Sequence, residues 1–167
     1  MMNKIITLLI AGLAAVMVLL LITRWATSKK RKGEQDEVIQ LPTFVWMTSI
    51  LAAGGIIMYR VLVAAGQAVD IWIKLKPSDV LKDMATTCCF MIGIGACWLL
   101  LLIGITAALV PAVLTGNNRR EAKVEVFEAG YFVVQGGLLL GTSLLMIPVL
   151  DELLALCLPV YKLNYFH

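Results

Sequence analysis

The chain has 167 residues, of which 60% are hydrophobic and only 15% are charged, with a formal net charge of +3. A soluble domain is typically about 45–50% apolar and about 25% charged, and a soluble fold of this length has no way to hide so much apolar surface. The composition therefore excludes an ordinary soluble protein and predicts an integral membrane protein with room for one domain.

The first apolar segment covers residues 5–22 and contains no charged side chain. Its 18 residues are near the lower limit for a transmembrane helix. The run is longer than the apolar core of a signal peptide, and no small-residue cleavage pattern follows it, so we interpret it as a retained helix. Trp25 comes next, where an interfacial aromatic side chain is expected.

The polar stretch 23–41 separates the first span from the second and is too short for a soluble domain. It contains one basic run, made of Lys29, Lys30, Arg31 and Lys32. The run has no interleaved aromatic residues and acidic residues follow it at once, so it is not a nucleic-acid signature. Beside a membrane helix, such a run marks the cytoplasmic side, and binding of anionic lipid is the alternative.

Pro42 suits the first turn of a second helix, because a proline there costs no hydrogen bond. We predict this span at residues 43–65, and it carries one charged residue, Arg60. Residues 68–76 are predicted as a short amphipathic segment at the membrane interface. Their alternating apolar pattern is equally typical of a strand, and so short a run does not decide between the two.

The third span is predicted at residues 84–110, closed by Pro111. Its 27 residues exceed the roughly 20 that a bilayer requires, so we expect it to tilt or to protrude. The fourth helix is expected to start early, near Arg119, and its membrane span is predicted at residues 126–147.

Pro148 interrupts the fourth apolar run, and Asp151 and Glu152 follow it. Carboxylates just after a proline suit the first turn of a new helix, where the helix dipole favours negative charge. We therefore predict a short interfacial segment at residues 149–160. The resulting fold class is all-α: one membrane domain, residues 1–167, formed by a four-helix bundle with short interfacial segments.

The basic residues are concentrated in the loops 24–40 and 115–125. The positive-inside rule places such loops in the cytoplasm, so both termini are expected outside. An acidic stripe at the start of the fourth helix shares this side; it consists of Glu121, Glu125 and Glu128. We expect weak attraction between the stripe and the basic run, against the alternative of two separately solvated faces. The short loops favour a bacterial inner membrane.

No residue pattern indicates a reaction, a cofactor or a metal. The single histidine is His167, the hydroxyl residues are scattered, and no phosphate-binding, dinucleotide or zinc-protease motif occurs. The four cysteines lack the spacing of a zinc site and are expected to act as small apolar side chains. A disulfide from Cys157 to Cys88 or Cys89 is expected only if that face meets an oxidising compartment.

Close helix packing is the better supported pattern. Gly137 and Gly141 form a G-x-x-x-G spacing in an apolar helix, and Gly93 begins a similar spacing of small residues in the third span. Gly54 and Gly55 are the candidates in the second span. Glycine lets two helix backbones approach closely, so we expect these positions to contact the chain's own bundle or another subunit.

Ionisable residues inside spans often mark transport pathways, because they are costly there. Arg60 is placed four or five residues from the outer end of its predicted span, within snorkelling reach of water. We expect it to pair with Asp151 or Glu152, and the alternatives are a lipid phosphate or Asp70.

The function expected from these patterns is that of a small non-enzymatic membrane subunit, which acts by helix packing in a homo-oligomer or in a larger transport or secretion assembly. Its expected partners are membrane lipids and other membrane subunits, with no nucleic acid and no cofactor. A small oligomeric channel or transporter is the second hypothesis. A membrane-embedded enzyme that uses the glutamate stripe is the third.

Overall fold

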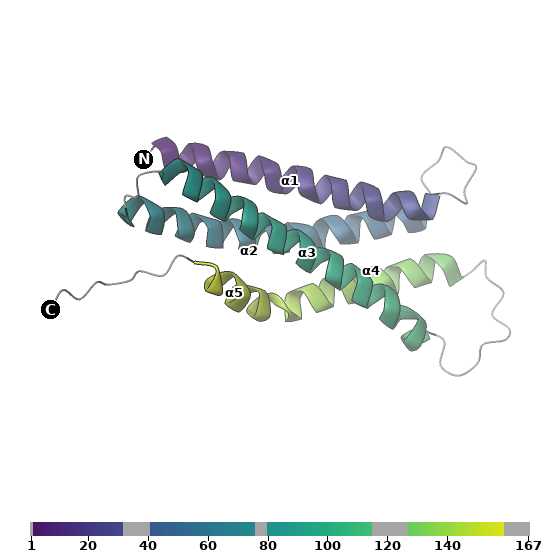
Figure 1. Ribbon diagram of the computed structural model, residues 1–167. Helices are drawn as coiled ribbons and strands as arrows, with labels where there is room; N and C mark the ends of the chain where they lie inside the picture. The colour runs from purple at the N-terminus through teal and green to yellow at the C-terminus, as the bar shows by residue number, and fades with distance from the viewer. Residues whose placement is uncertain (1, 32–40, 76–79, 115–126, 159–167) are drawn as a thin grey trace.

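The computed structural model describes residues 2–31, 41–75, 80–114 and 127–158, which are almost entirely helical (Figure 1). This part of the chain forms five helices in the order α1 (Met2–Arg31), α2 (Leu41–Leu75), α3 (Val80–Leu114), α4 (Phe127–Leu145) and α5 (Ile147–Leu156). The predicted all-α fold class is confirmed.

Three of these helices are each long and apolar enough to cross a membrane, over Lys4–Ser28, Thr43–Leu75 and Leu81–Val110. The helices α4 and α5 meet the same criterion only as a pair, bent by 48° at the short break between them. The described residues therefore contain three candidate membrane spans, or four if the bent pair counts as one, as in an integral membrane protein.

The spans lie alongside one another in alternating directions (Figure 1). The helix α1 begins at the end of the bundle where α2 ends and α3 begins. Lys4 of α1 forms an ion pair with Asp70 of α2 there, and Trp72 Nε1 donates a hydrogen bond to Thr87 Oγ1 of α3 at 3.1 Å. The helices α2 and α3 each contact all four other helices, and the contacts of α2 are the more extensive, so α2 is the centre of the bundle.

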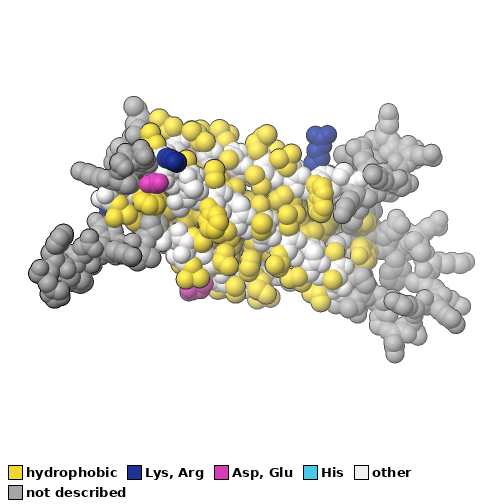
Figure 2. Space-filling view, viewed as in Figure 1, with side chains coloured by type: hydrophobic (Ala, Val, Ile, Leu, Met, Phe, Trp, Pro, Cys, Tyr) yellow, Lys and Arg dark blue, Asp and Glu magenta, His cyan; other side chains and the backbone are white. Residues whose placement is uncertain are grey.

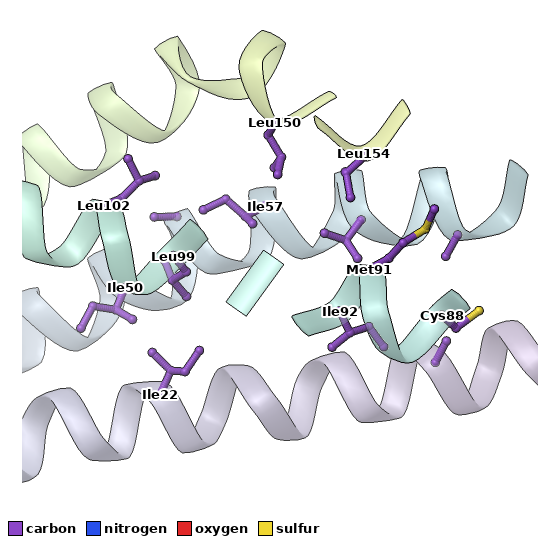
Figure 3. Packing of buried hydrophobic residues seen from close by; sticks show 14 of the residues in the cluster. Ile22, Ile50, Ile57, Cys88, Met91, Ile92, Leu99, Leu102, Leu150 and Leu154 are labelled. Carbon is purple, nitrogen blue, oxygen red and sulfur yellow. The ribbon is translucent and has the colours of Figure 1, made fainter. Parts of the chain in front are cut away.

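One apolar cluster joins all five helices. Figure 3 shows Ile22 of α1, Ile57 of α2, Met91 of α3 and the α5 leucines directed into the space between the helices. The helix α1 packs through small residues such as Ala11 and keeps its large apolar side chains exposed, as a lipid-facing helix does. The core thus lies along α2, and α1 covers one side of it.

The helices extend further than the sequence predicted. The helix α1 continues past residue 22 to Arg31, and α2 continues past residue 65 to Leu75. A separate segment at residues 68–76 was therefore a wrong prediction, and so was the strand alternative. The physical reason is that Ala68 and Val69 are fully buried, so the inward face of α2 simply continues.

The two proline predictions had different outcomes. The helix α3 continues for three residues beyond Pro111, because a proline in the last turn removes only one backbone hydrogen bond. The break before Pro148 is present, and the short helix after it is α5. One face of this helix packs into the bundle, because Leu150 and Leu154, one turn apart, are at most 1% exposed. The expected early start near Arg119 lies outside the described residues.

Candidate functional site

The candidate site is built around the bend between α4 and α5. Met146 N donates to Thr142 O at 3.0 Å, and Leu150 N donates to Met146 O at 3.1 Å, so backbone hydrogen bonds bridge the bend. Pro148 lies in the first turn of α5, where its missing N–H costs no helical hydrogen bond. The chain is therefore bent at this point without losing its helical connection.

The bend brings Asp151 next to Arg60 of the central helix. Arg60 Nη1 lies 3.7 Å from Asp151 Oδ2, and the two side chains keep 41% and 43% of their surface exposed. Of the two carboxylates expected as partners of Arg60, the structure thus brings Asp151 to it. Glu152 is exposed and forms no ion pair with any residue that the structure describes. Asp70, the alternative partner, contacts Lys4 instead.

Arg60 lies near the middle of the candidate span Thr43–Leu75, which corrects its predicted place near the end of a span. The helix α2 continues from Arg60 to Leu75, and Asp70, which contacts Lys4, lies about 15 Å beyond Arg60 at 1.5 Å per residue. The uncharged stretch of α1 between Lys4 and Arg24 is about 30 Å long, the thickness of a hydrocarbon core. Arg60 is therefore about halfway across.

Contacts with α3 place Arg60 at the same depth. A Cβ atom added to Gly95 would lie 2.7 Å from Val61 Cγ2, so this glycine faces the residue next to Arg60. Position 95 is also the middle of the candidate span Leu81–Val110. Two neighbouring helices thus agree that Arg60 lies near mid-depth.

This depth gives the ion pair an unusual environment. Figure 2 shows that hydrophobic side chains dominate the middle of the visible face and that charged side chains are few. A charged side chain at the centre of a membrane helix costs about 2.5–3.5 kcal/mol on insertion scales. Pairing reduces this cost, but a separation of 3.7 Å is longer than a hydrogen bond, and both side chains remain partly exposed.

Glycine holds the helices of the bundle close together at three positions. A Cβ atom on Gly54 would overlap Leu19 Cδ1 and lie 3.0 Å from Leu99 Cδ2, so Gly54 admits side chains from both α1 and α3. The other predicted packing glycines have no such atom within 4 Å; they are Gly55, Gly93, Gly137 and Gly141. These four glycines therefore make no close contact at the Cβ position within the described residues, and their contact with another subunit stays a prediction.

The sequence interpretation missed the other two packing glycines, Gly95 and Gly136. A Cβ atom on Gly136 would overlap Ser49 Oγ and lie 3.0 Å from Ser49 Cβ. The serine hydroxyl donates to Val45 O at 2.9 Å, so it is already engaged on α2. The contact between Gly136 and Ser49 is therefore where the backbones of α2 and α4 approach each other.

The predicted charged faces fall largely outside the described part of the chain. Residues 29–31 end α1, but their side chains are not described, and position 128 in the first turn of α4 is in the same situation. The rest of the two faces, Lys32, Glu121 and Glu125, lies outside the described residues. The expected attraction between the basic run and the glutamate stripe therefore stays a prediction.

The four cysteines are free thiols, so the structure contains no disulfide at Cys157. Cys88 is buried, as expected of a small apolar side chain, whereas Cys89 and Cys97 are exposed on the outer surface of α3. Within residues 2–31, 41–75, 80–114 and 127–158, no three His, Cys, Asp or Glu side chains are grouped closely enough to hold a metal ion.

The site is thus a mid-depth cluster of one basic and two acidic residues, with a formal charge of −1 from Arg60, Asp151 and Glu152. It lies at the surface of the bundle, at the bend between α4 and α5. Comparison with known proteins assigns no family to it: no protein-family model, no curated protein and no solved structure matches the chain.

Proposed function

We propose that the protein is a small non-enzymatic subunit of a membrane assembly, which acts by packing its helices against other membrane-embedded chains. The observation that carries the proposal is the partly exposed pair of Arg60 and Asp151 near mid-depth. Ionisable residues at this depth usually face the interior of a bundle or a water-filled cavity, because hydrocarbon solvates them poorly. A further chain that covers the pair removes this exposure.

The outward glycines support the same function. Gly55, Gly93 and Gly137 are exposed and have open space at the Cβ position. Glycines on the outside of a membrane helix leave a shallow surface that the backbone of another helix can approach. They are therefore suited to contacts between chains, whereas Gly54, Gly95 and Gly136 serve contacts inside this chain.

A small oligomeric channel or transporter is the second candidate, and the bend favours it. Transporters place binding sites near mid-depth at interrupted helices, and charged residues there mark the pathway. One chain offers a single arginine and two carboxylates at this depth, so a pathway would require several copies. The two candidates share the assembly step and differ in whether the assembly conducts.

The test is native mass spectrometry after gentle extraction, with conductance of the reconstituted protein as a second readout. We expect the wild-type chain in an oligomer or bound to another membrane protein, and the variant R60L/D151L as a folded monomer. A control variant, K4Q/D70N, neutralises the ion pair at the end of the bundle and should assemble as the wild type does. A wild-type chain that stays monomeric in several mild detergents would contradict the proposal.

A separate prediction concerns the orientation in the membrane. The basic loops place the end of the bundle near Ser28 in the cytoplasm and the end near Lys74 outside. Both side chains are exposed, so single cysteines at these positions in a cysteine-free background are accessible to an impermeant thiol reagent. In intact cells we expect Lys74→Cys to be labelled and Ser28→Cys to be protected; the reverse pattern refutes the orientation.

A further inference from the structure

The helix α5 has one face directed away from the core. Leu150 and Leu154 occupy its buried side. The positions on the other side follow the i, i+3, i+4, i+7 spacing of a single helix face. Together with Arg60 of α2 they form a surface that we call the α5 charged face, made of Arg60, Pro148, Asp151, Glu152 and Ala155. Three of these residues are exposed, and the two members of the ion pair are partly so.

The charges on this face are not balanced within the described part of the chain. A guanidinium group has five N–H donors, and the 3.7 Å approach of Asp151 does not amount to a hydrogen bond with any of them. Glu152 has no cationic partner among the described residues, although it follows Asp151 directly. An arginine that is only loosely paired and a carboxylate without such a partner therefore lie at nearly the same depth on one surface.

We propose that two copies of this chain associate through the α5 charged face about a two-fold axis parallel to the membrane normal, so that Arg60 of each copy pairs with Glu152 of the other. This inference rests on the proposed role as a membrane subunit and names the partner. A rotation about the normal preserves depth, so groups at one depth in a chain meet groups at that depth in its copy. A two-fold interface also forms each contact twice, so Glu152 of both copies gains a counter-charge.

The second copy suits this face better than a lipid phosphate does. A phosphate would add an anion to a cluster that already has a formal charge of −1 and would leave Glu152 without a partner. The α5 charged face carries both signs, so it is complementary to itself. Pro148 and Ala155 on the same face are compact, and they let a second α5 approach closely.

The test is charge exchange between two differently tagged chains expressed together. Arg60→Glu in one chain and Glu152→Arg in the other each place like charges across their own homodimer interface. In the mixed dimer each of the two contacts again joins one basic and one acidic side chain, because the two substitutions face each other and the two unchanged residues do the same. We expect the mixed dimer to exceed either homodimer by about tenfold, where random pairing gives about twofold, so the pairing preference is about 1 kcal/mol. A mixed share no greater than random pairing overturns the proposal.

A matched control changes the same amount of charge elsewhere. Lys74→Glu lies at the exposed end of α2, far from the α5 charged face, so a chain with this change should show no preference for the Glu152→Arg chain. A preference of similar size in this control would mean that net charge, and not the proposed contact, drives the pairing. It would therefore overturn the proposal.

Cross-linking keeps the proposal testable if the Arg60→Glu chain does not fold. In a cysteine-free background, Ala155→Cys should form a disulfide between two copies under mild oxidation, whereas Ala14→Cys on the exposed side of α1 should not. Absence of the cross-link at position 155 overturns the self-pairing. If the cross-link is absent but the chain co-purifies with another membrane protein, the pairing of two copies is wrong and the proposed subunit function stands. A strictly monomeric chain contradicts both the pairing and the subunit function.

Discussion

Replacement of Gly136 by leucine is expected to lower the free energy of unfolding by about 3 kcal/mol, whereas the same change at Gly137 leaves it nearly unchanged. Even a single Cβ atom at Gly136 would overlap the Ser49 hydroxyl, and that hydroxyl is held by its hydrogen bond to Val45 O. At Gly137 the Cβ position is open. Both substitutions replace glycine by leucine at adjacent positions of α4, so they change the helix propensity by the same amount. The difference in stability between them therefore measures the contact with α2.

The measurement is the unfolding free energy of the purified protein in detergent, followed by circular dichroism during denaturation. Ser49→Gly combined with Gly136→Ala provides the rescue, because it removes the atoms that the new methyl group would meet. We expect this double variant to be more stable than Gly136→Ala alone. Equal losses of stability for Gly136→Leu and Gly137→Leu would show that α2 and α4 do not cross at this point.

Replacement of Arg60 by leucine is expected to cost about 3 kcal/mol, since it leaves Asp151 without its counter-charge at mid-depth. The double variant R60L/D151L should recover the loss and reach at least the stability of the wild type, because two apolar side chains need no solvation in hydrocarbon. The pair is therefore expected to cost stability relative to an apolar replacement. The proposed contact with another chain would explain why the pair is present.

The control is Arg24→Leu, which removes an exposed arginine from α1. Arg24 lies at the end of the uncharged stretch that begins after Lys4. Its side chain is near the membrane boundary, so we expect a change below about 1 kcal/mol. Unfolding in bilayers rather than in detergent gives the larger contrast, because a bilayer has a hydrocarbon core of defined thickness, about 30 Å, whereas a detergent micelle adapts its shape to the protein. If Arg60→Leu and Arg24→Leu have equal effects in bilayers, the assigned depth is wrong.

The all-α membrane fold was predictable because hydrophobicity over about 20 residues is a strong signal that does not depend on tertiary contacts. The ends of the helices were less predictable, because they do depend on tertiary contacts. Residues 68–76 read as a separate amphipathic segment, because charged residues such as Asp70 and Lys74 lie among apolar ones. In the structure this segment continues α2, since Ala68 and Val69 pack against neighbouring helices that the local sequence does not reveal.

The packing glycines show that a spacing motif does not reveal which way a helix face points. The G-x-x-x-G pattern of Gly137 and Gly141 describes a face of α4 but not the direction of that face. The polar residues of the helix carry the missing signal, because Gln135 and Ser143 avoid lipid and are 2% and 1% exposed. At 100° per residue, Gly136 lies on their side of α4 and Gly137 points away from it. The phase relative to polar residues predicts the packing glycine.

Identification of the ion pair required both the residue types in the sequence and the packing of α5 in the structure. The residue types were sufficient to connect Arg60 with the carboxylates after Pro148, because each needs a partner away from water. The choice of Asp151 over Glu152 depends on which side of α5 faces α2, and that is set by the burial of Leu150 and Leu154. The depth of the pair was misjudged because the end of α2 was misplaced.

The bend between α4 and α5 also bears on how the chain enters the bilayer during synthesis. The first three spans are each apolar enough to partition on their own, whereas the last reaches the same criterion only as two joined helices that contain adjacent carboxylates. The arginine that faces these carboxylates lies in the second span, which is synthesised earlier. We therefore expect the counter-charge to be in the membrane before the acidic segment leaves the ribosome, and insertion of the last span to depend on its docking against α2.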